Sequence, residues 1–400
     1  MINSERKFTR RLSRMSNAPE RRLAYVPAGV LPNARLCTTI SIATHMTIQS
    51  EQPQAPQPYQ LERLRVIMRA EPHDPDEEMG VLNPATARGL DGKLYLFPRV
   101  VAAANYSRIG IAEVIFDHHG EPSDVRRMGY VLEPTESWEQ NRLTAGCEDP
   151  RVMFIEPLGY YLMTYTAYGP LGPRIALAMS RDVRTWERIG PVKFRYVPDY
   201  RTDFDLFHNK DAYIFPKPVR DPHGAWALAL IHRPSNTQDH LLVVPRAISE
   251  PRASIWISYC DIEAAQKDPN ALLIWRDHQL LATPLYDWES LKIGGGTPPV
   301  LTPHGWLMLY HGVSGRIVED LDLQPFVHYA AGAMILDRDD PRKILYRSAT
   351  PILQPMHVEE RQGTVPNVVF PTGVDVRENG RIDVYYGMAD AAIGVAKLVM

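Results

Sequence analysis

Two adjacent carboxylates in the run Gly146-Cys147-Glu148-Asp149-Pro150-Arg151 could carry chemistry. Successive side chains of an extended chain point to opposite sides, so one carboxylate can face a channel while the other pairs with Arg151 or a neighbouring loop. A turn held by a salt bridge is the alternative interpretation of this run. Glu148 and Asp149 are therefore candidate site residues only in combination with the groups described next.

A second group of candidates is rich in cations and amides. It consists of Phe207-His208-Asn209-Lys210-Asp211, which precedes a short apolar strand, and of Ile231-His232-Arg233-Pro234 at the end of the next strand. Arginine offers a planar fork of donors and lysine a compact charge, which together suit a phosphate or a carboxylate. A solvated loop is the alternative interpretation. The candidates for binding an anion or a substrate are His208, Asn209, Lys210 and Arg233.

A third candidate is the run Lys292-Ile293-Gly294-Gly295-Gly296-Thr297-Pro298-Pro299, followed one strand later by Tyr310-His311-Gly312. Three successive glycines allow the backbone to approach a ligand closely and to expose N–H groups, and Lys292 adds positive charge for an anion. The run lacks the Gly-Lys-Ser/Thr signature and the strand-to-helix context of nucleotide-binding loops, which argues against nucleotide binding. A lone histidine is more often structural, but His311 lies at a strand end opposite the glycine run and is a candidate.

The C-terminal run Tyr385-Tyr386-Gly387-Met388-Ala389-Asp390 is an aromatic strand that ends in a carboxylate. Carbohydrate sites typically pair aromatic platforms with carboxylates that bind hydroxyl groups. An aspartate at a strand end also forms turns, so Asp390 decides nothing by itself.

Strands must position these runs, because the chain repeats itself five times beyond its N-terminal region. In each repeat a glycine turn leads into an apolar run, and a second run of small and β-branched residues follows a polar loop. The first runs are residues 92–96, 159–163, 224–228, 305–309 and 380–384. Their partners are residues 109–112, 175–178, 255–258, 331–334 and 393–396. We expect each pair to form the inner hairpin of one sheet.

The repeats predict the fold class. Short strands between glycine and proline turns, with 35 prolines and few stretches of helical periodicity, favour an all-β protein over an α/β protein. Five similar sheets at spacings of roughly fifty to eighty residues predict a five-bladed β-propeller over residues 59–400. The alternative is a β-sandwich or a two-barrel protein. A propeller would bring loop residues from every blade together at one end of its central channel.

Composition excludes several classes of function. Forty-four basic and 47 acidic residues give a formal net charge of −3, which argues against nucleic acid or an anionic membrane as a partner. Cys37, Cys147 and Cys260 are too few and too widely spaced for a disulfide framework or a zinc knuckle, so we expect a reducing, cytoplasmic location. No apolar stretch approaches the length of a membrane span.

The N-terminal residues 1–58 lack periodicity and end in a Pro/Gln tract, so we expect a disordered or extended tail. Met46 is a candidate alternative start within this tail, a hypothesis that N-terminal sequencing of the native protein tests. The tail supplies none of the candidate site residues.

Taken together, these segments resemble glycoside hydrolase family 130, the β-mannoside phosphorylases and related β-mannosidases. The resemblance covers roughly residues 65–400 and follows the family's order of motifs. The segments that carry it are Asn83-Pro84-Ala85, Ser107-Arg108-Ile109-Gly110, Glu148-Asp149-Pro150-Arg151, Asn209-Lys210-Asp211, His232-Arg233-Pro234, Lys292-Ile293-Gly294-Gly295-Gly296 with Pro298-Pro299, Tyr310-His311-Gly312, Val369-Phe370-Pro371-Thr372-Gly373, and Tyr386-Gly387 with Asp390. No single motif is decisive, and the ordered set makes the resemblance specific.

The resemblance implies a five-bladed propeller and assigns roles to residues. Asp149 matches the catalytic acid, which protonates the departing glycosidic oxygen, in several members through the mannosyl 3-hydroxyl. The positions that bind phosphate in phosphorolytic members are matched by Arg233, Lys292 and His311. The positions that contact sugar or phosphate are matched by Arg108, Asn209 and Asp390. His208, where phosphorylases of this group often carry arginine, joins the phosphate-binding candidates, and Lys210 and Tyr310 join the substrate-binding candidates.

The implied reaction is an inverting phosphorolysis of a β-mannoside to α-mannose 1-phosphate and a shortened acceptor. Phosphate is already anionic at neutral pH, so it needs no second carboxylate as base but does need a cationic cradle. The expected partners are a β-mannoside and inorganic phosphate as co-substrate, with no further cofactor and no metal, and a homo-oligomer is left open. The alternatives are a β-mannosidase that uses water on the same fold and a non-catalytic, glycan-binding propeller.

Overall fold

The computed structural model describes residues 58–141, 146–198, 203–235, 250–318 and 324–400. These residues are mostly β-strand, with two short α-helices among them, α1 (Ile262–Lys267) and α2 (Val358–Arg361). No helix in the described part of the chain is long and apolar enough to cross a membrane. The tail predicted for residues 1–58 lies outside the described residues, apart from Pro58.

The strands form five antiparallel blades of four main strands each, which confirms the predicted five-bladed β-propeller. Blade 1 contains β2 (Gly80–Arg88), β3 (Leu94–Ala102), β4 (Tyr106–Phe116) and β5 (Pro122–Leu132). Blade 2 contains β6 (Gly146–Ile155), β7 (Tyr160–Gly169), β8 (Gly172–Ser180) and β9 (Glu187–Pro191). Blade 3 contains β11 (His208–Ile214), β13 (Trp226–Ser235), β14 (Ile255–Cys260) and β15 (Ile274–Ala282). Blade 4 contains β16 (Lys292–Gly295), β18 (Gly305–Gly315), β19 (Val327–Leu336) and β20 (Ile344–Arg347). Blade 5 contains β21 (Val369–Val376), β22 (Ile382–Met388), β23 (Ala392–Val399) and β1 (Gln60–Arg69).

Smaller elements connect or flank the blades. The short strands are β10 (Lys193–Phe194), β12 (Val219–Arg220) and β17 (Val300–Thr302). The 3₁₀ turns are η1 (Pro75–Glu77), η2 (Ala103–Asn105), η4 (Phe204–Leu206), η5 (Pro269–Leu273) and η6 (Asp287–Glu289). A single bridge, Ser107 to Gly146, joins the sheets of blades 1 and 2.

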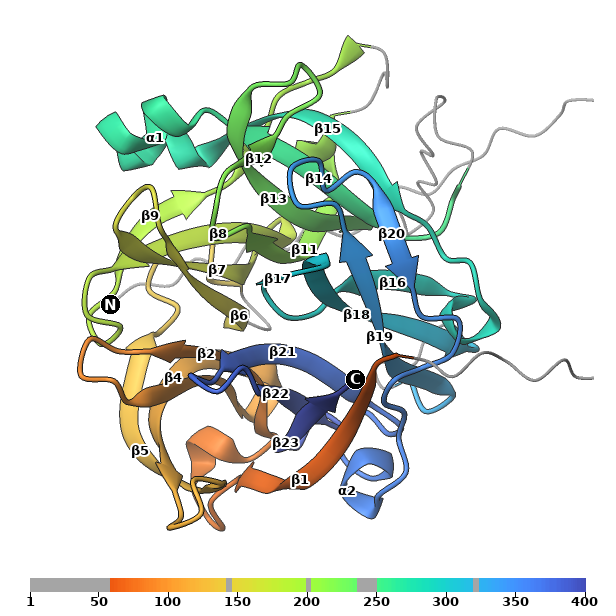
Figure 1. The fold of residues 1–400 in the computed structure, drawn as a ribbon. Coiled ribbons are helices and arrows are strands. Elements are labelled where there is room, and N and C mark those ends of the chain that lie inside the picture. Colours follow the sequence, from red (N-terminus) through yellow and green to blue (C-terminus); the bar gives the residue numbers. More distant parts are fainter. Residues whose placement is uncertain (1–57, 142–145, 199–202, 236–249, 319–323) are drawn as a thin grey trace, which may run out of the picture. The chain divides into compact units, whose positions relative to one another are not determined.

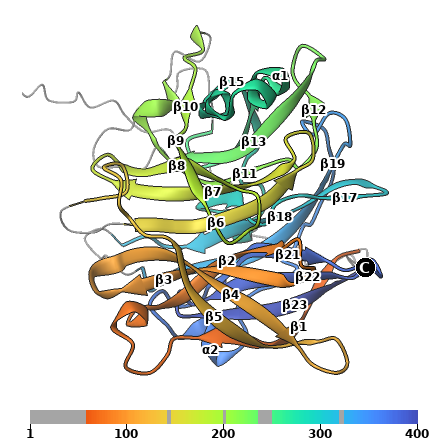
Figure 2. The ribbon, with the colours of Figure 1, turned by 90° about the vertical axis from the view of Figure 1, so that its left-hand side faces the viewer.

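Each predicted pair of runs forms the second and third strands of one blade, which confirms the five hairpins. In blades 1, 2, 3 and 5 the first strand lies toward the middle of the ring and the fourth toward its outside (Figure 1). The twisted sheets of blades 1 and 2 are seen from the side in Figure 2. A strand between two neighbouring blades is buried on both faces, so β7 is an almost unbroken run of buried residues, whereas the outer strand β5 alternates.

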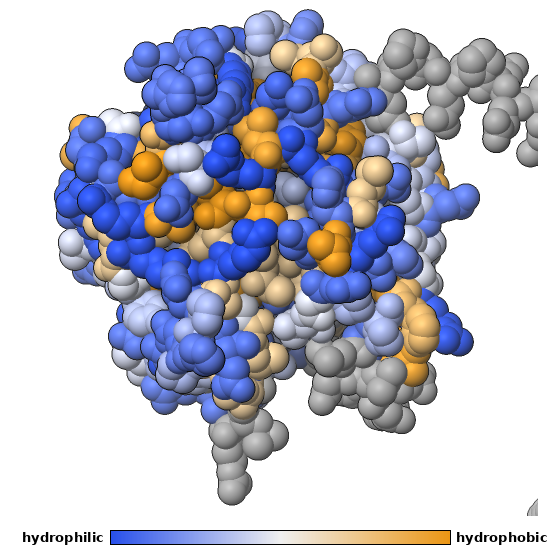
Figure 3. Space-filling model, turned by 90° about the horizontal axis from the view of Figure 1, so that it is seen from below, coloured by the Kyte–Doolittle hydropathy of each residue, from blue (hydrophilic) through white to orange (hydrophobic). Residues whose placement is uncertain are grey.

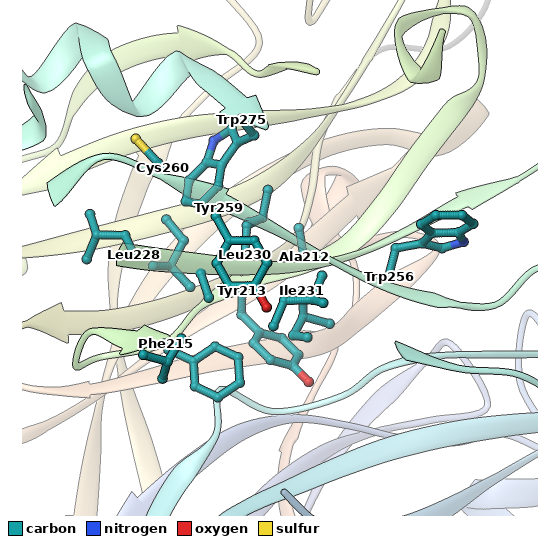
Figure 4. Packing of buried hydrophobic residues seen from close by; sticks show 14 of the residues in the cluster. Ala212, Tyr213, Phe215, Leu228, Leu230, Ile231, Trp256, Tyr259, Cys260 and Trp275 are labelled. Atoms are coloured by element: carbon teal, nitrogen blue, oxygen red, sulfur yellow. The ribbon is translucent and has the colours of Figure 1, made fainter. Parts of the chain in front are cut away.

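Apolar side chains fill the space between neighbouring blades. In one cluster, Tyr213 of β11 lies among Leu230 and Ile231 of β13 and Tyr259 of β14, all fully buried (Figure 4). The same cluster continues into blade 2 through Leu162 and Leu177 and into blade 4 through side chains such as Met308. Burial of this apolar surface therefore holds the first strands in place around the central channel.

The first strands of four blades contain a β-bulge, where one extra residue faces its partner strand. In blades 1, 2 and 3 the bulge begins with a residue in the left-handed region: Asn83 (φ 44°), Asp149 (φ 44°) and Asp211 (φ 56°). Asparagine and aspartate tolerate this conformation better than other non-glycine residues, and a bulge redirects a side chain. Equivalent bulges thus place three polar side chains, one from each blade, at the channel.

A buried glutamate ties the outer strand of several blades to the segment that precedes their first strand. In blade 2, Glu139 accepts hydrogen bonds from Tyr165 Oη in β7 (2.6 Å) and from Arg188 Nε in β9 (2.7 Å). Backbone N–H groups of its own turn donate to its second oxygen. The glutamate therefore joins the segment before the first strand to the second and fourth strands. We call the set formed by this glutamate, the tyrosine and the arginine a clamp.

The same clamp recurs in blades 4 and 5. The blade 4 set is Glu289, Tyr310 and Arg347, and the blade 5 set is Glu360, Tyr386 and Arg63. Blade 1 keeps the ion pair of Glu77 with Arg127, at 2.9 Å, but has Pro98 where the other blades have tyrosine. Blade 3 differs, and its arrangement is described below.

The two ends of the described chain meet in blade 5, where β1 pairs with β23 from Gln60 opposite Val399 to Arg69 opposite Ala392. The face of the molecule on the side of β1 and α2 is mostly hydrophilic, with hydrophobic side chains gathered in a few places (Figure 3).

Candidate active site

A cavity of about 210 Å³ takes residues from all five blades. Its polar lining comes mainly from first and second strands, and its apolar lining comes mainly from blades 4 and 5. The polar and charged residues are Asn83, Arg99, Asp149, Lys210, Asp211, Arg233, Lys292, His311, Gln324, Tyr329 and Asp390. The apolar residues are Leu291, Val313, Ile317, Val327, Val365, Val368 and Phe370.

Asp149 lies on one wall, projected by the bulge of β6. Its Oδ1 accepts hydrogen bonds from Asn83 Nδ2 (2.8 Å) and Arg99 Nη1 (3.3 Å). Burial favours the protonated acid, but the charges of Arg99, Lys210 and Arg151 and the hydrogen bond from Asn83 outweigh burial and hold the pKa of Asp149 below its ordinary value. In the protein alone, Asp149 is therefore a carboxylate.

Glu148 does not line the cavity, although it shares a partner with Asp149. Its Oε1 accepts from Arg99 Nη2 at 2.8 Å and lies 3.4 Å from Asn105 Nδ2, so a loop residue and a neighbouring strand supply its partners. Arg151, the other partner considered, donates instead to the carbonyl oxygens of Asp149 (2.7 Å) and Gly296 (2.6 Å). One guanidinium, that of Arg99, thus holds both adjacent carboxylates.

Lys210, Arg233, Lys292 and His311 also line the cavity, and we call them the basic cluster. Lys210 and Arg233 stand opposite each other in β11 and β13. Burial disfavours charge on Lys210, but Asp149, Glu148 and Asp211 outweigh it and raise the pKa of this lysine. Lys210 is therefore a cation.

The charges around Lys292 and His311 are more positive than those around Lys210. Burial and the like charges of Arg233 and Lys210 lower the pKa of Lys292 to about 7. Burial lowers the pKa of His311 to about 3, against the attraction of Asp211, whose Oδ2 lies 3.6 Å from His311 Nε2. His311 is therefore a neutral imidazole, and its Nδ1 has no hydrogen-bond partner among the described residues.

The three glycines do not form the ligand-binding loop expected from their sequence. Gly294 and Gly295 belong to β16 and pair with His311 and Tyr310, and the N–H of Gly296 donates to Leu309 O at 3.1 Å. All three glycines are buried and none lines the cavity, so the expectation that their N–H groups are exposed to a ligand is wrong. The glycines give space instead, because a Cβ on Gly294 would lie 2.4 Å from Asp211 Oδ2 and 2.4 Å from His311 Cε1.

Asp390 follows β22 and reaches the cavity near Asp149. Burial, with the nearby charges of Asp149 and Glu148, raises the pKa of Asp390 to about 6, although Arg99 and Lys210 act in the opposite direction. The aromatic residues that line the cavity are Tyr329 and Phe370, whereas Tyr385 and Tyr386 are buried between blades.

Four of the predicted site residues lie elsewhere in the fold. Asn209 is buried and donates from Nδ2 to His232 Nδ1 at 3.0 Å. Tyr310 belongs to the clamp of blade 4. His208 begins β11 opposite Ser235, with its ring against Gly172. Arg108 lies between the rings of Tyr106 and Tyr130 and pairs with Asp76 and Glu133 at 3.1 Å each.

Five polar lining residues were not chosen as site residues from the sequence: Asn83, Arg99, Asp211, Gln324 and Tyr329. Asn83 and Asp211 did stand in the motifs that carry the family resemblance, and the left-handed bulge explains why a short polar residue is required there. Arg99 has a weaker signal, a single charge within the otherwise apolar strand 94–102. No group of three or more His, Cys, Asp or Glu side chains among the described residues is arranged to hold a metal ion.

Comparison with known proteins identifies the family. A family model described as beta-1,4-mannooligosaccharide phosphorylase matches residues 54–400. The chain belongs to glycoside hydrolase family 130. This confirms the resemblance inferred from the motifs, and the protein is accordingly an enzyme of the mannoside phosphorylase class.

The relatives are named for different mannoside substrates. A 1,2-β-oligomannan phosphorylase of Thermoanaerobacter sp. strain X514 is 32% identical over 291 residues, which are 69% of this chain and 79% of that protein. A β-1,4-mannooligosaccharide phosphorylase of Ruminococcus albus is 32% identical over 250 residues, 62% of this chain and 61% of that protein. The structure of a β-1,2-mannobiose phosphorylase from Listeria innocua superimposes with a TM-score of 0.62 at 23% identity, covering 86% of this chain and 97% of that one, which supports the fold.

Proposed function

We propose that this family 130 enzyme catalyses the inverting phosphorolysis of β-mannosides to α-mannose 1-phosphate and a shortened acceptor. The proposal rests on one observation: the cavity lining places a carboxylate on one wall and a group of basic side chains on another. Asp149 lies on the wall formed with Asn83 and Arg99, and the basic cluster supplies positive charge from blades 3 and 4.

Asp149 is the proposed acid for the departing glycosidic oxygen. A general acid must carry a proton, whereas Arg99, Lys210 and Arg151 favour the carboxylate in the protein alone. A phosphate dianion against the basic cluster offsets part of that positive charge, so the pKa of Asp149 rises in the substrate complex. The proton then passes to the oxygen, directly or through the mannosyl 3-hydroxyl.

Phosphate is the proposed nucleophile, held by Arg233, Lys292 and His311. Arg233 and Lys292 offer charged donors, and His311 Nδ1 faces no partner among the described residues. An oxygen of the phosphate attacks C1 from the side opposite the departing group, which inverts the anomeric configuration. The C1–O bond to the acceptor breaks as the C1–O bond to phosphate forms, and the acceptor leaves as an alcohol.

The electrostatics favour phosphate over water as the attacking group. A water would require a carboxylate base, and Asp211, which lies among the basic cluster, is held in an ion pair by Arg233 at 2.5 Å. Phosphate brings its own negative charge and gains from every cation near it.

The proposal is tested by incubating the purified protein with β-1,2- and β-1,4-linked mannobiose, mannosyl-glucose and mannosyl-N-acetylglucosamine, with and without phosphate. We expect phosphate-dependent release of mannose 1-phosphate from at least one substrate. Free mannose at the same rate without phosphate would identify a β-mannosidase, and the absence of any product would favour the glycan-binding propeller.

A further inference from the structure

Blade 3 has no glutamate clamp and contains a chain of neutral side chains at the corresponding place. Asn209 Nδ2 lies 3.0 Å from His232 Nδ1, and His232 Nε2 lies 2.8 Å from Ser258 Oγ. Ser258 Oγ lies 2.8 Å from His278 Nδ1, and His278 Nε2 lies 2.9 Å from the carbonyl oxygen of Arg195. All four side chains are buried, at 2% exposure or less.

The carbonyl at the outer end determines the direction of every hydrogen bond. A carbonyl oxygen only accepts, so His278 Nε2 carries the hydrogen and Nδ1 of the neutral ring accepts from the hydroxyl of Ser258. Ser258 Oγ in turn accepts from His232 Nε2, and His232 Nδ1 accepts from the amide of Asn209. Burial lowers the pKa of both histidines, which keeps the rings neutral and the direction unchanged.

This chain of hydrogen bonds ends directly behind the basic cluster. His232 precedes Arg233 in β13 and stands opposite the bulge of β11, which contains Asp211. Asn209 precedes Lys210 in β11, so its hydrogen bond to His232 joins the two strands beside the facing pair of Lys210 and Arg233. Their backbone positions therefore depend on this hydrogen bond.

In blade 3 this chain of hydrogen bonds takes the place that the clamp has in other blades, and it consists of neutral groups. His232 occupies the place that Tyr165 has in blade 2, and His278 lies on the outer strand, as Arg188 does. Each of the other clamps contains a buried carboxylate. In those clamps the carboxylate is paired with an arginine, whereas the blade 3 chain joins its strands without any charged group.

We infer that Asn209, His232, Ser258 and His278 act as positioning residues for phosphate, holding Lys210 and Arg233 in place through neutral hydrogen bonds. The inference rests on the proposed phosphorolysis and deepens it. It also gives Asn209 a role that needs no contact with substrate.

The test is the affinity for inorganic phosphate, measured by titration calorimetry, beside the KM for phosphate and kcat. Ser258→Ala removes the central hydroxyl, and we expect the Kd and the KM for phosphate to rise about fivefold, as for one lost buried hydrogen bond, with kcat at saturating phosphate nearly unchanged. His278→Leu breaks the chain nearer its outer end and should act in the same direction. Ser258→Thr keeps the hydroxyl and should recover most of the affinity.

Tyr386→Phe is the matched control, because it removes an equally buried hydroxyl from the clamp of blade 5. We expect it to lower the melting temperature about as much as Ser258→Ala while leaving the Kd for phosphate unchanged. Equal phosphate affinity in wild type, Ser258→Ala and His278→Leu would overturn the inference alone. Wild-type protein that binds no phosphate would overturn the proposed function, and the inference with it.

Discussion

Arg233 and Asp211 form a buried ion pair in which Nε of the guanidinium lies 2.5 Å from Oδ2 of the carboxylate. Both side chains are almost completely removed from water, with 4% and 2% exposed. The pair lies at the bulge of β11, so the same contact fixes the strand geometry and the direction of Arg233. Stability and anion binding are therefore coupled at this point of the fold.

Asp211→Asn should lower the free energy of unfolding by about 3 kcal/mol at pH 7, because it leaves a buried guanidinium uncompensated. Burial raises the pKa of Asp211, but Arg233, with His311 and Lys210, holds it well below the ordinary value. A lowered carboxyl pKa gives stability that is present above about pH 4 and lost as the pH falls below it. Urea unfolding from pH 7 to pH 3 should show the difference between wild type and variant shrinking, and a constant difference would contradict this account.

Asp149→Asn should reduce kcat about 10³-fold, within the range for loss of a general acid, while the fold and phosphate binding persist. A mannoside with a dinitrophenyl leaving group needs no protonation, so the variant should recover much of its rate on that substrate. Equal losses on the dinitrophenyl mannoside and on a disaccharide would argue that Asp149 positions substrate and does not donate a proton. The circular dichroism spectrum serves as the control for folding.

Phosphate binding should be accompanied by proton uptake at Lys292. The pKa of this lysine is lowered to about 7, and a bound anion raises it, so affinity is greatest below pH 7 and falls as the pH rises above it. Calorimetry at pH 8 in buffers of different ionisation enthalpy measures the uptake. Lys292→Met should abolish the part due to the lysine and leave the part due to phosphate itself. Identical uptake in both proteins would refute the assignment.

Gly294→Ala should impair both stability and phosphate affinity, because its Cβ would approach Asp211 Oδ2 and His311 within 2.4 Å. We expect a loss of about 1 to 3 kcal/mol in unfolding free energy, as for an overpacked core. Gly120→Ala is the matched control: it carries backbone strain (φ 76°) but meets nothing within 4 Å. The control should lose about 1 kcal/mol and bind phosphate normally. Urea midpoints and phosphate titrations distinguish the two.

The sequence predicted the hairpins and the basic cluster because both depend on local signals. Glycine turns followed by apolar runs mark the second and third strands. Lys210 and Lys292 stand at or near the start of first strands, and Arg233 and His311 lie in second strands. Arg99 was not predicted as a site residue, because its role depends on contacts with Glu148 and Asp149, which lie about fifty residues away and in another blade.

Tyr310 and the glycine run show the opposite error, since both looked like ligand-binding features. The hydroxyl of Tyr310 is held by Glu289, which precedes β16, and the glycines relieve crowding between strands. Neither fact can be read from a single segment, because each depends on contacts with residues of other segments. The clamp becomes recognisable only when the blades are compared in three dimensions.

The pairing of β1 with β23 has a consequence for synthesis on the ribosome. Blade 5 gives the cavity Phe370 and Asp390, and its outer strand comes from the beginning of the described chain while its third strand, Ala392–Val399, comes from the end. The early strand β1 has no partner strand until β23 has been synthesised. A nascent chain that already carries Asp149 and the basic cluster therefore has an open ring, which closes only when β23 pairs with β1.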